Sequence, residues 1–477
     1  MTGDLQFPLW LTIAAFVVDV VASLHVILHK RDVRAAIGWV GLIWLVPVAG
    51  AALYALFGIN RVRRRAREIR RARPRTISET AEHVASMAMV ARNHPNLTGL
   101  SMLVEKLSGR ALLGGNAVEP LINGDAAYPE MLAAIDGATQ SIALSTFIFA
   151  PDAAGRRFID ALARAVQRGV VVRVLLDAAG VRYNFPPAHW ALRKAGVPVA
   201  RFLPTIVQAG PAFFNLRNHR KLLIVDGQLA FAGGMNIHAR CLSVTPPRRG
   251  VREVHFRVEG PVVAQLTDVF VDDWRFVTGE ALEGPRWYAE LTQVGSTSAR
   301  VITDGPDGDL DVLRAVILGA ITSARESVRI VTPYFLPDPP MIAALGVAAL
   351  RGVEVDIVLP SRVNIPIAQW ASTALLWQVL KPGCRVFLSP LPFDHSKLFV
   401  IDRSWALIGS SNWDPRSLRL NFELDIECHD AAFATRIDDM VSERIALSRS
   451  YSLAEADGRS FAVRVRDGTA RLLTPYL

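Results

Sequence analysis

The chain has 477 residues, a net charge of +9 and a hydrophobic content of 51%. Its mean hydropathy of +0.27 is high for a purely soluble protein and indicates a membrane-embedded part. Three distant cysteines (Cys241, Cys384 and Cys428) exclude a disulfide framework and a cysteine-based zinc module. The positive charge is local, because nine arginines and one glutamate between Arg61 and Arg75 give +8. This stripe directly follows an apolar segment, so lipid headgroups explain it better than nucleic acid does; a solvated helix face is the alternative.

Two apolar segments open the chain. Pro8–Leu28 contains Asp19 and His25, whereas Ala35–Gly58 is apolar throughout its 24 residues. About 20 apolar residues cross a bilayer as a helix, so the second segment predicts a transmembrane helix. A charge at bilayer depth is costly, so Asp19 needs a partner, and whether the first segment fully spans stays open.

The connection from His29 to Arg34 is short and carries three positive residues. It predicts a transmembrane helical hairpin over residues 1–60, with nine arginines beyond its second helix. By the positive-inside rule, both ends of the hairpin and everything after it then lie in the cytoplasm.

From about residue 115 the sequence repeats itself. The elements expected in the first half are a helix through Ile135, a strand Ser141–Phe149, a helix Arg156–Arg168 and a strand Val170–Leu176. Those expected in the second half are a helix Leu310–Ala324, a strand Val328–Thr332, a helix Pro340–Arg351 and a strand Val353–Leu359. In both halves the second helix ends on Arg-Gly-Val, where glycine signals a helix C-terminus. This order predicts an α/β fold with domains at 113–292 and 293–477, after a basic linker at 61–112.

Each half ends on the same set of residues. From the histidine, the offsets to Lys, Asp, Gly and Asn are 2, 7, 14 and 17 in both copies. The copies are His219, Lys221, Asp226, Gly233 and Asn236, and His395, Lys397, Asp402, Gly409 and Asn412. A lone histidine on a strand is usually structural, but two copies in the same spacing, in a chain with only six lysines, indicate one shared site.

The spacing also predicts local structure. The expected strands are Lys221–Val225, Leu229–Ala232, Lys397–Ile401 and Trp405–Ile408. Residues two apart on a strand share a face, so each histidine is expected to point the same way as its lysine. A lysine is a compact point charge suited to a phosphate oxygen. The small pair after the second strand lets backbone approach a ligand.

The sequence resembles the phospholipase D superfamily, and within it the bacterial cardiolipin synthases, over nearly the whole chain. The residues that carry the resemblance are the two motifs with Asn218, the exit Leu53–Gly58 with its basic tail, Glu259–Pro261, Asp273–Trp274, Thr332–Pro337, Asp414–Ser417 and Asn421–Glu423. Two departures occur: Ile237–Arg240 replaces an acidic–aromatic stretch, and Glu253 stands where the family often has a shorter acid. The resemblance implies two tandem phospholipase-D-like domains with pseudo-twofold symmetry, in the bacterial inner membrane.

A mechanism follows from the resemblance. His219 attacks phosphorus to form a phosphatidyl-histidine, and His395 protonates the departing glycerol and then deprotonates the incoming hydroxyl. This assignment follows the family's usual order, and the reverse stays open. The groups expected to hold the phosphate oxygens are Lys221, Lys397, Asn236 and Asn412. Glu253 and Glu423 are candidates for fixing each imidazole's tautomer. For Asp226 and Asp402, bonds to turn backbone are favoured over a proton role.

The expected substrate is phosphatidylglycerol and the expected surroundings are an anionic membrane surface, with no nucleic acid partner. No metal or cofactor is expected, because the two histidines lie 176 residues apart without carboxylates at ligand spacing. A phospholipase D-type hydrolase, or a transferase with another donor or acceptor lipid, is the alternative; two complete motifs argue against an inactive scaffold. The segment Ile365–Leu380 either lines an acyl channel or, as favoured, is an amphipathic core helix. The histidines His238, His255 and His429 are interpreted as structural or surface residues.

Overall fold

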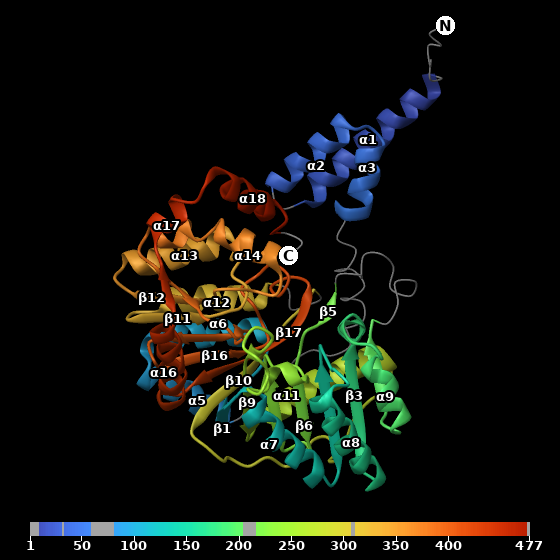
Figure 1. Cartoon of the computed structure of the whole chain (residues 1–477), viewed down its shortest axis with the longest axis vertical. Helices are drawn as coiled ribbons and strands as arrows, with labels where there is room; N and C mark the ends of the chain where they lie inside the picture. Colours follow the sequence, from blue (N-terminus) through green and yellow to red (C-terminus); the bar gives the residue numbers. More distant parts are fainter. Residues whose placement is uncertain (1–8, 31–32, 59–80, 204–215, 307–310, 475–477) are drawn as a thin grey trace. The chain divides into compact units, whose positions relative to one another are not determined.

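The computed structural model describes residues 9–30, 33–58, 81–203, 216–306 and 311–474. Among these, the helices of residues 9–58 belong to one compact unit, and the chain from residue 81 onward forms another. Figure 1 shows both.

The N-terminal unit consists of α1 (Leu9–His29), α2 (Val33–Leu45), α3 (Ala49–Leu53) and the π-helical turn η1 (Tyr54–Gly58). Within the described residues, α1 alone is long and apolar enough to cross a membrane. The second apolar segment is interrupted at Pro47, which has no backbone N–H and disfavours a continuous helix, and Val48 has φ of +64°. The expectation that Ala35–Gly58 forms one transmembrane helix was therefore wrong, because the 13 residues of α2 cover only about 20 Å of a hydrocarbon core of about 30 Å.

Asp19, which required a partner, has one inside this unit. Its Oδ1 accepts a hydrogen bond from the backbone N–H of Val48 at 3.0 Å, and its side chain is buried. The break in the second segment thus exposes a backbone donor that the first segment satisfies.

The second unit is built on a 16-stranded sheet. Its order is β18 (Arg449–Tyr451), β13 (Arg385–Ser389), β12 (Glu354–Pro360), β11 (Ser327–Val331), β15 (Leu398–Ile401), β16 (Trp405–Gly409), β17 (Asn421–His429), β10 (Thr297–Asp304), β1 (Leu113–Ile122), β9 (Val254–Glu259), β7 (Leu229–Gly233), β6 (Leu222–Val225), β2 (Ser141–Thr146), β3 (Val171–Asp177) and β4 (Val199–Phe202), and β5 (Arg217–Asn218) pairs with β17. Apart from β18, which has no counterpart, the strands of the two halves follow in the same order from the outer edges to the antiparallel pair β1–β10, which joins the halves. Each half carries one parallel run, β2–β3–β4 or β11–β12–β13. The α/β fold with two similar halves is confirmed.

Helices pack against this sheet in both halves (Figure 1). Those of the first half are α7 (Asn123–Gly137), α8 (Ala153–Gln167), α9 (Ala188–Lys194) and α11 (Val262–Thr278). Those of the second are α12 (Val312–Ser323), α13 (Pro339–Leu350), α14 (Pro366–Thr373), α15 (Trp377–Leu380), α16 (Ala431–Leu447), α17 (Leu453–Asp457) and α18 (Phe461–Leu472). As predicted, Gly169 and Gly352 follow α8 and α13 with φ of +87° and +90°, a left-handed conformation that glycine adopts without strain.

Two expected regions differ in detail. Part of the expected linker forms α5 (Ala81–Asn93), η2 (Pro95–Leu97) and α6 (Thr98–Ser108), and buried Leu100 and Val104 join the core of the second half. The segment Ile365–Leu380 is two short helices, and Ala371 and Leu375 pack with α18. This packing favours the core interpretation over an acyl channel.

Candidate active site

His219 reaches the site on a strand that crosses between the halves. Strand β5, in the first half, pairs in parallel with β17 of the second. The backbone N–H of His219 donates to the carbonyl of Phe422 at 3.0 Å. This pairing brings the imidazole Nδ1 to 3.0 Å from Glu423 Oε2.

His395 is held by the same arrangement in reverse. Strand β14 (Phe393–Asp394), in the second half, pairs in parallel with β8 (Val251–Arg252) of the first. The backbone N–H of His395 donates to the carbonyl of Arg252 at 2.8 Å, and its Nδ1 lies 2.6 Å from Glu253 Oε2. Each half therefore supplies the carboxylate for the other half's histidine.

The two carboxylates give both imidazoles the same orientation. A carboxylate accepts from Nδ1–H, which leaves Nε2 of His219 for chemistry, whereas Nε2 of His395 lies 3.2 Å from Lys397 Nζ. Burial lowers the pKa of His219 to about 4, although Glu423 acts in the opposite direction, so the ring is neutral near pH 7. A neutral imidazole with a free Nε2 lone pair can attack phosphorus.

Electrostatic coupling across the halves shows that both motifs meet at one place. Lys397 contributes to lowering the pKa of His219, and Lys221 and His219 contribute to lowering that of His395. Burial lowers the pKa of Lys221 to about 7 and also lowers that of Lys397. Each ammonium group donates to the backbone carbonyl of the histidine in its own motif. Two buried cations beside two imidazoles form a site suited to a phosphate anion.

The two halves of the site differ in the groups that surround the carboxylate. Glu423 accepts hydrogen bonds from His219, from Ser410 Oγ at 2.5 Å and from Asn421 Nδ2 at 3.0 Å. Burial acts to raise the pKa of Glu423, but the neighbouring His219, Lys221 and Ser410 hold it below the usual value. Sequence reasoning missed Ser410, because the pair Gly409–Ser410 indicated only small residues.

Among the residues that the structure describes, no hydroxyl donates to Glu253. Gly234 stands where the second half has Ser410, and a Cβ at Gly234 would lie 2.5 Å from Glu253 Oε1. Burial raises the pKa of Glu253 to about 7. One imidazole thus faces an ionised carboxylate, and the other faces one that takes up a proton near neutral pH.

The two motif asparagines are held differently. The side-chain oxygen of Asn236 accepts from the backbone N–H of Ile148 at 2.9 Å, which leaves its amide nitrogen to donate. The side-chain oxygen of Asn412 is buried and makes no hydrogen bond within the described part of the chain.

Asp226 and Asp402 lie at the opposite ends of their strands. Asp226 accepts from three consecutive backbone N–H groups, those of residues 139–141, at 2.7–2.9 Å. Asp402 accepts from those of residues 325–327 at 2.8–2.9 Å. Strands β6 and β15 put about 16 Å between each aspartate and its motif lysine, which favours the turn-bonding role.

The motif strands begin one residue later than expected. Strands β6 and β15 start at Leu222 and Leu398, directly after each lysine, and Lys397 Nζ lies 2.7 Å from Nδ1 of His395, so in this copy the lysine and the histidine point the same way, as predicted. Each histidine directly follows a crossing strand. Aromatic rings flank the imidazoles: Phe147 lies 5.2 Å from His219 between ring centroids. Tyr334 and Phe393 lie 6.4 and 5.7 Å from His395 in the same measure.

The three histidines that were interpreted as structural or surface residues, His238, His255 and His429, fall into two groups. Burial lowers the pKa of His255 to about 3, and His429 is buried beside Glu427. Both fit the structural interpretation. His238 contributes a little to the lowered pKa of His395, after burial and the nearby lysines, and it contacts Tyr128 and Cys241.

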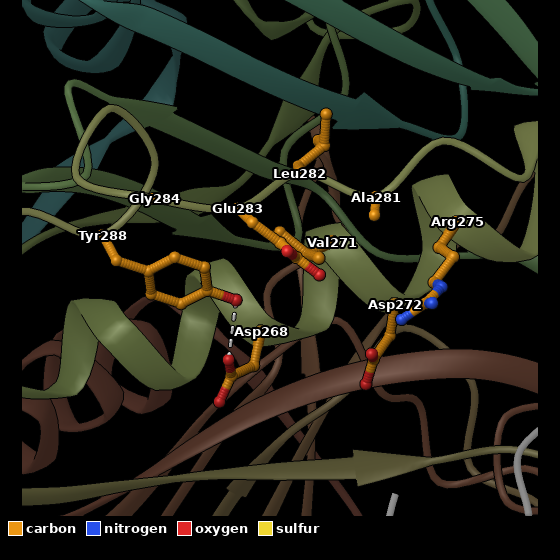
Figure 2. A pocket seen from close by; sticks show the side chains of 9 residues that line it. All are labelled: Asp268, Val271, Asp272, Arg275, Ala281, Leu282, Glu283, Gly284 and Tyr288. Atoms are coloured by element: carbon orange, nitrogen blue, oxygen red, sulfur yellow. Dashed lines mark hydrogen bonds between the residues drawn. The ribbon is translucent and has the colours of Figure 1, made fainter. Parts of the chain in front are cut away.

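A separate cavity of about 320 Å³ lies on α11 and the segment that follows it (Figure 2). The charged residues that line it are Asp268, Asp272, Arg275 and Glu283, and Tyr288 donates to Asp268 at 2.9 Å. Three carboxylates against one guanidinium repel a phosphodiester, so this cavity is not the site for such a substrate.

Comparisons with known proteins agree with this geometry. A family described as "Cardiolipin synthase, PLD-like domain" matches residues 131–274 and 317–445, and "Phospholipase D-nuclease N-terminal" matches residues 17–58. Cardiolipin synthase A of Pseudomonas fluorescens is 32% identical over 96% of this chain and 95% of that protein. The major cardiolipin synthase ClsA of Bacillus subtilis is 28% identical over 97% of this chain and 98% of its own length.

A solved structure shares the fold. Phosphatidylserine synthase from Haemophilus influenzae matches 79% of this chain and 100% of its own with a TM-score of 0.61, at 15% identity. Two matched domains in one chain, full-length relatives and a site assembled from both halves lead to one conclusion. The chain belongs to the bacterial cardiolipin synthases of the phospholipase D superfamily.

Proposed function

We propose that this enzyme transfers a phosphatidyl group from one phosphatidylglycerol to another, giving cardiolipin and glycerol. The observation that supports it best is the pair of histidines, each held by a carboxylate from the opposite half. A transfer through an enzyme intermediate needs a nucleophile and a proton carrier at one phosphorus, and this pair supplies both.

In the first step, His219 Nε2 attacks phosphorus and an N–P bond forms. The bond between phosphorus and the glycerol oxygen breaks, and His395 Nε2 gives its proton to that oxygen. The ammonium groups of Lys221 and Lys397 and the amides of Asn236 and Asn412 bind the non-bridging oxygens, where charge accumulates.

In the second step, the now neutral His395 takes a proton from the hydroxyl of the second phosphatidylglycerol. The alkoxide oxygen attacks phosphorus, the N–P bond breaks, and His219 leaves as neutral imidazole. The ionised Glu423 supports this cycle, because it stabilises the positive charge that His219 carries in the intermediate.

The proton on His395 depends on the substrate. In the free enzyme, burial and the nearby lysines lower the pKa of His395. A bound phosphodiester brings a negative charge between Lys221 and Lys397, which offsets their repulsion of a proton. Protonation of His395 is therefore coupled to binding of the lipid headgroup.

The enzyme is associated with a membrane through its N-terminal apolar helix, and we place it in a bacterial inner membrane. The arginines between Arg61 and Arg75 would lie against anionic headgroups on the cytoplasmic side, with the catalytic halves on that side as well.

The test is incubation of the purified protein with phosphatidylglycerol liposomes, without added divalent metal, followed by lipid mass spectrometry. Cardiolipin and free glycerol are expected, with both lost in His219→Ala and His395→Ala and kept in the control His94→Ala. Phosphatidic acid alone would identify a hydrolase. Turnover only after another headgroup lipid is added would keep the chemistry and refute phosphatidylglycerol as the sole substrate.

A further inference from the structure

The second apolar segment reverses direction within the N-terminal unit. Trp39 and Tyr54 are 15 residues apart, which would separate them by about 22 Å along one helix. Their ring centroids are instead 5.4 Å apart. A Cβ at Gly50 would lie 2.5 Å from the carbonyl oxygen of Leu42, so α3 returns directly along α2. Figure 1 shows α2 and α3 side by side next to α1.

The turn between them lies halfway along α1. Asp19 is ten residues from both Leu9 and His29, the two ends of α1. Its carboxylate holds the N–H of Val48 at 3.0 Å, so the turn is fixed about 15 Å from either end of the span. Backbone donors at that depth must be satisfied inside the protein, and this hydrogen bond does so at the break.

The outer faces of this segment are apolar. Ile37, Leu45 and Leu56 are 68%, 82% and 57% exposed, whereas Val26, Ile43 and Tyr54 form a buried cluster that joins the three helical pieces. Exposed aliphatic side chains around a short helix pair fit the acyl chains of a lipid leaflet.

The flanking charges agree with a segment that enters and leaves on one side. Lys30 and Arg31 precede it, Arg34 lies in its first turn, and nine arginines from Arg61 to Arg75 follow it. If the segment spanned the bilayer, the smaller of these two basic groups would lie on the outer side, which the positive-inside rule disfavours although the larger group would be inside. Before Leu9 the only charged side chain is Asp4.

We infer that Val33–Gly58 is a re-entrant helical hairpin, inserted into the cytoplasmic leaflet alone, and that Leu9–His29 is the one crossing among the described residues. The hairpin contacts the acyl chains of that leaflet. Its turn, at the hydrogen bond between Asp19 and Val48, lies near the middle of the bilayer. The residues before Leu9 then lie on the outer side, and both basic groups lie on the inner side. The inference is independent of the reaction that the second unit catalyses.

Cysteine labelling of the full-length protein in native membranes tests it. The native Cys241, Cys384 and Cys428 are buried, so wild type serves as the background. Leu9→Cys and Lys30→Cys are treated with a membrane-impermeant maleimide on spheroplasts and on inverted vesicles. We expect Leu9→Cys to react only on spheroplasts and Lys30→Cys only on inverted vesicles.

A spanning hairpin gives the opposite pattern at both positions and overturns the inference. So does reaction of both positions on inverted vesicles alone, because α1 would then not cross. Since a cysteine could disturb insertion, a second measurement uses alkaline phosphatase fused ahead of residue 1, with its own signal sequence removed. Phosphatase activity in intact cells supports an outer N-terminal end, and an inactive but full-length fusion contradicts it.

Discussion

Removing the charge of Glu423 while keeping its shape separates the two roles of this carboxylate. In Glu423→Gln, the side-chain oxygen can still accept from His219 and Ser410. The new NH₂ would face Asn421, whose side-chain oxygen is buried and has no hydrogen-bond partner within the described residues. Rotation of that amide satisfies both groups. The variant therefore keeps the imidazole's orientation and loses only the negative charge.

The expected loss follows from the strength of that interaction. A hydrogen bond to a charged group contributes about 1.5–3 kcal/mol. At about 1.36 kcal/mol per tenfold in rate, kcat falls roughly 10- to 150-fold. Because the pKa of Glu423 lies below its usual value, the residue is ionised from pH 5 to 9, and the loss is constant over that range.

Glu253→Gln is the matched control. Burial raises the pKa of Glu253 to about 7, so at low pH the wild-type residue is already neutral and resembles glutamine. The ratio of wild-type to Glu253→Gln activity should be near one at pH 5 and increase as the pH passes 7 toward 9. This ratio of activities removes the pH dependence that comes from groups present in both proteins.

The assay is the initial rate of cardiolipin formation from phosphatidylglycerol liposomes at pH 5 to 9. The phosphatidylated enzyme is measured after a quench in SDS at neutral pH, because the N–P bond is labile in acid. The reasoning is refuted if both variants show the same pH dependence. A loss below about twofold in Glu423→Gln would equally show that the charge does not stabilise the intermediate.

Three further outcomes are expected. Gly234→Ala crowds the glutamate that holds the second imidazole and should lower kcat, whereas Gly137→Ala, with open space around it, should not; equal activities would contradict the geometry. Asp402→Ala removes three backbone hydrogen bonds and should lower the free energy of unfolding by about 1–3 kcal/mol, with kcat of the folded enzyme nearly unchanged; a large drop in kcat at unchanged Tm would instead indicate a proton role. Asp19→Leu leaves the N–H of Val48 without an acceptor and should lower the free energy of unfolding by about 1–3 kcal/mol, seen as a lower melting temperature in detergent. Asp19→Asn still offers an oxygen to this N–H, so its free energy of unfolding should fall less.

Local patterns allowed the α/β halves to be predicted. Helices that end at Gly169 and Gly352 and the apolar strands after them depend on residues near one another in sequence. The crossing strands were not predicted, because two-residue strands carry no periodic signal. Their partners are also remote: Glu423 is 204 residues from His219, and Glu253 is 142 residues from His395. The spacing therefore indicated one shared site, but it did not indicate which half supplies the carboxylate that orients each histidine.

The N-terminal segment shows a different limit. Hydropathy measures how apolar a stretch is, and it does not measure the direction in which the chain runs. The 24 residues from Ala35 to Gly58 satisfy the length criterion, although Pro47 in their middle interrupts the helix. The free-energy cost of placing the Asp19 carboxylate in the bilayer was more informative, because it required a partner for this side chain. The break in the second segment provides that partner, the backbone N–H of Val48.

The exchange of carboxylates between halves has a consequence for synthesis. A ribosome-bound chain that has released only the first half carries His219 but not Glu423, and Glu253 but not the ring that it orients. Strand β14 emerges before β17, so His395 can meet Glu253 while His219 still lacks Glu423. A chain that ends before Asn421 therefore has one imidazole oriented and the other not, and the two-histidine site is complete only once β17 has paired with β5.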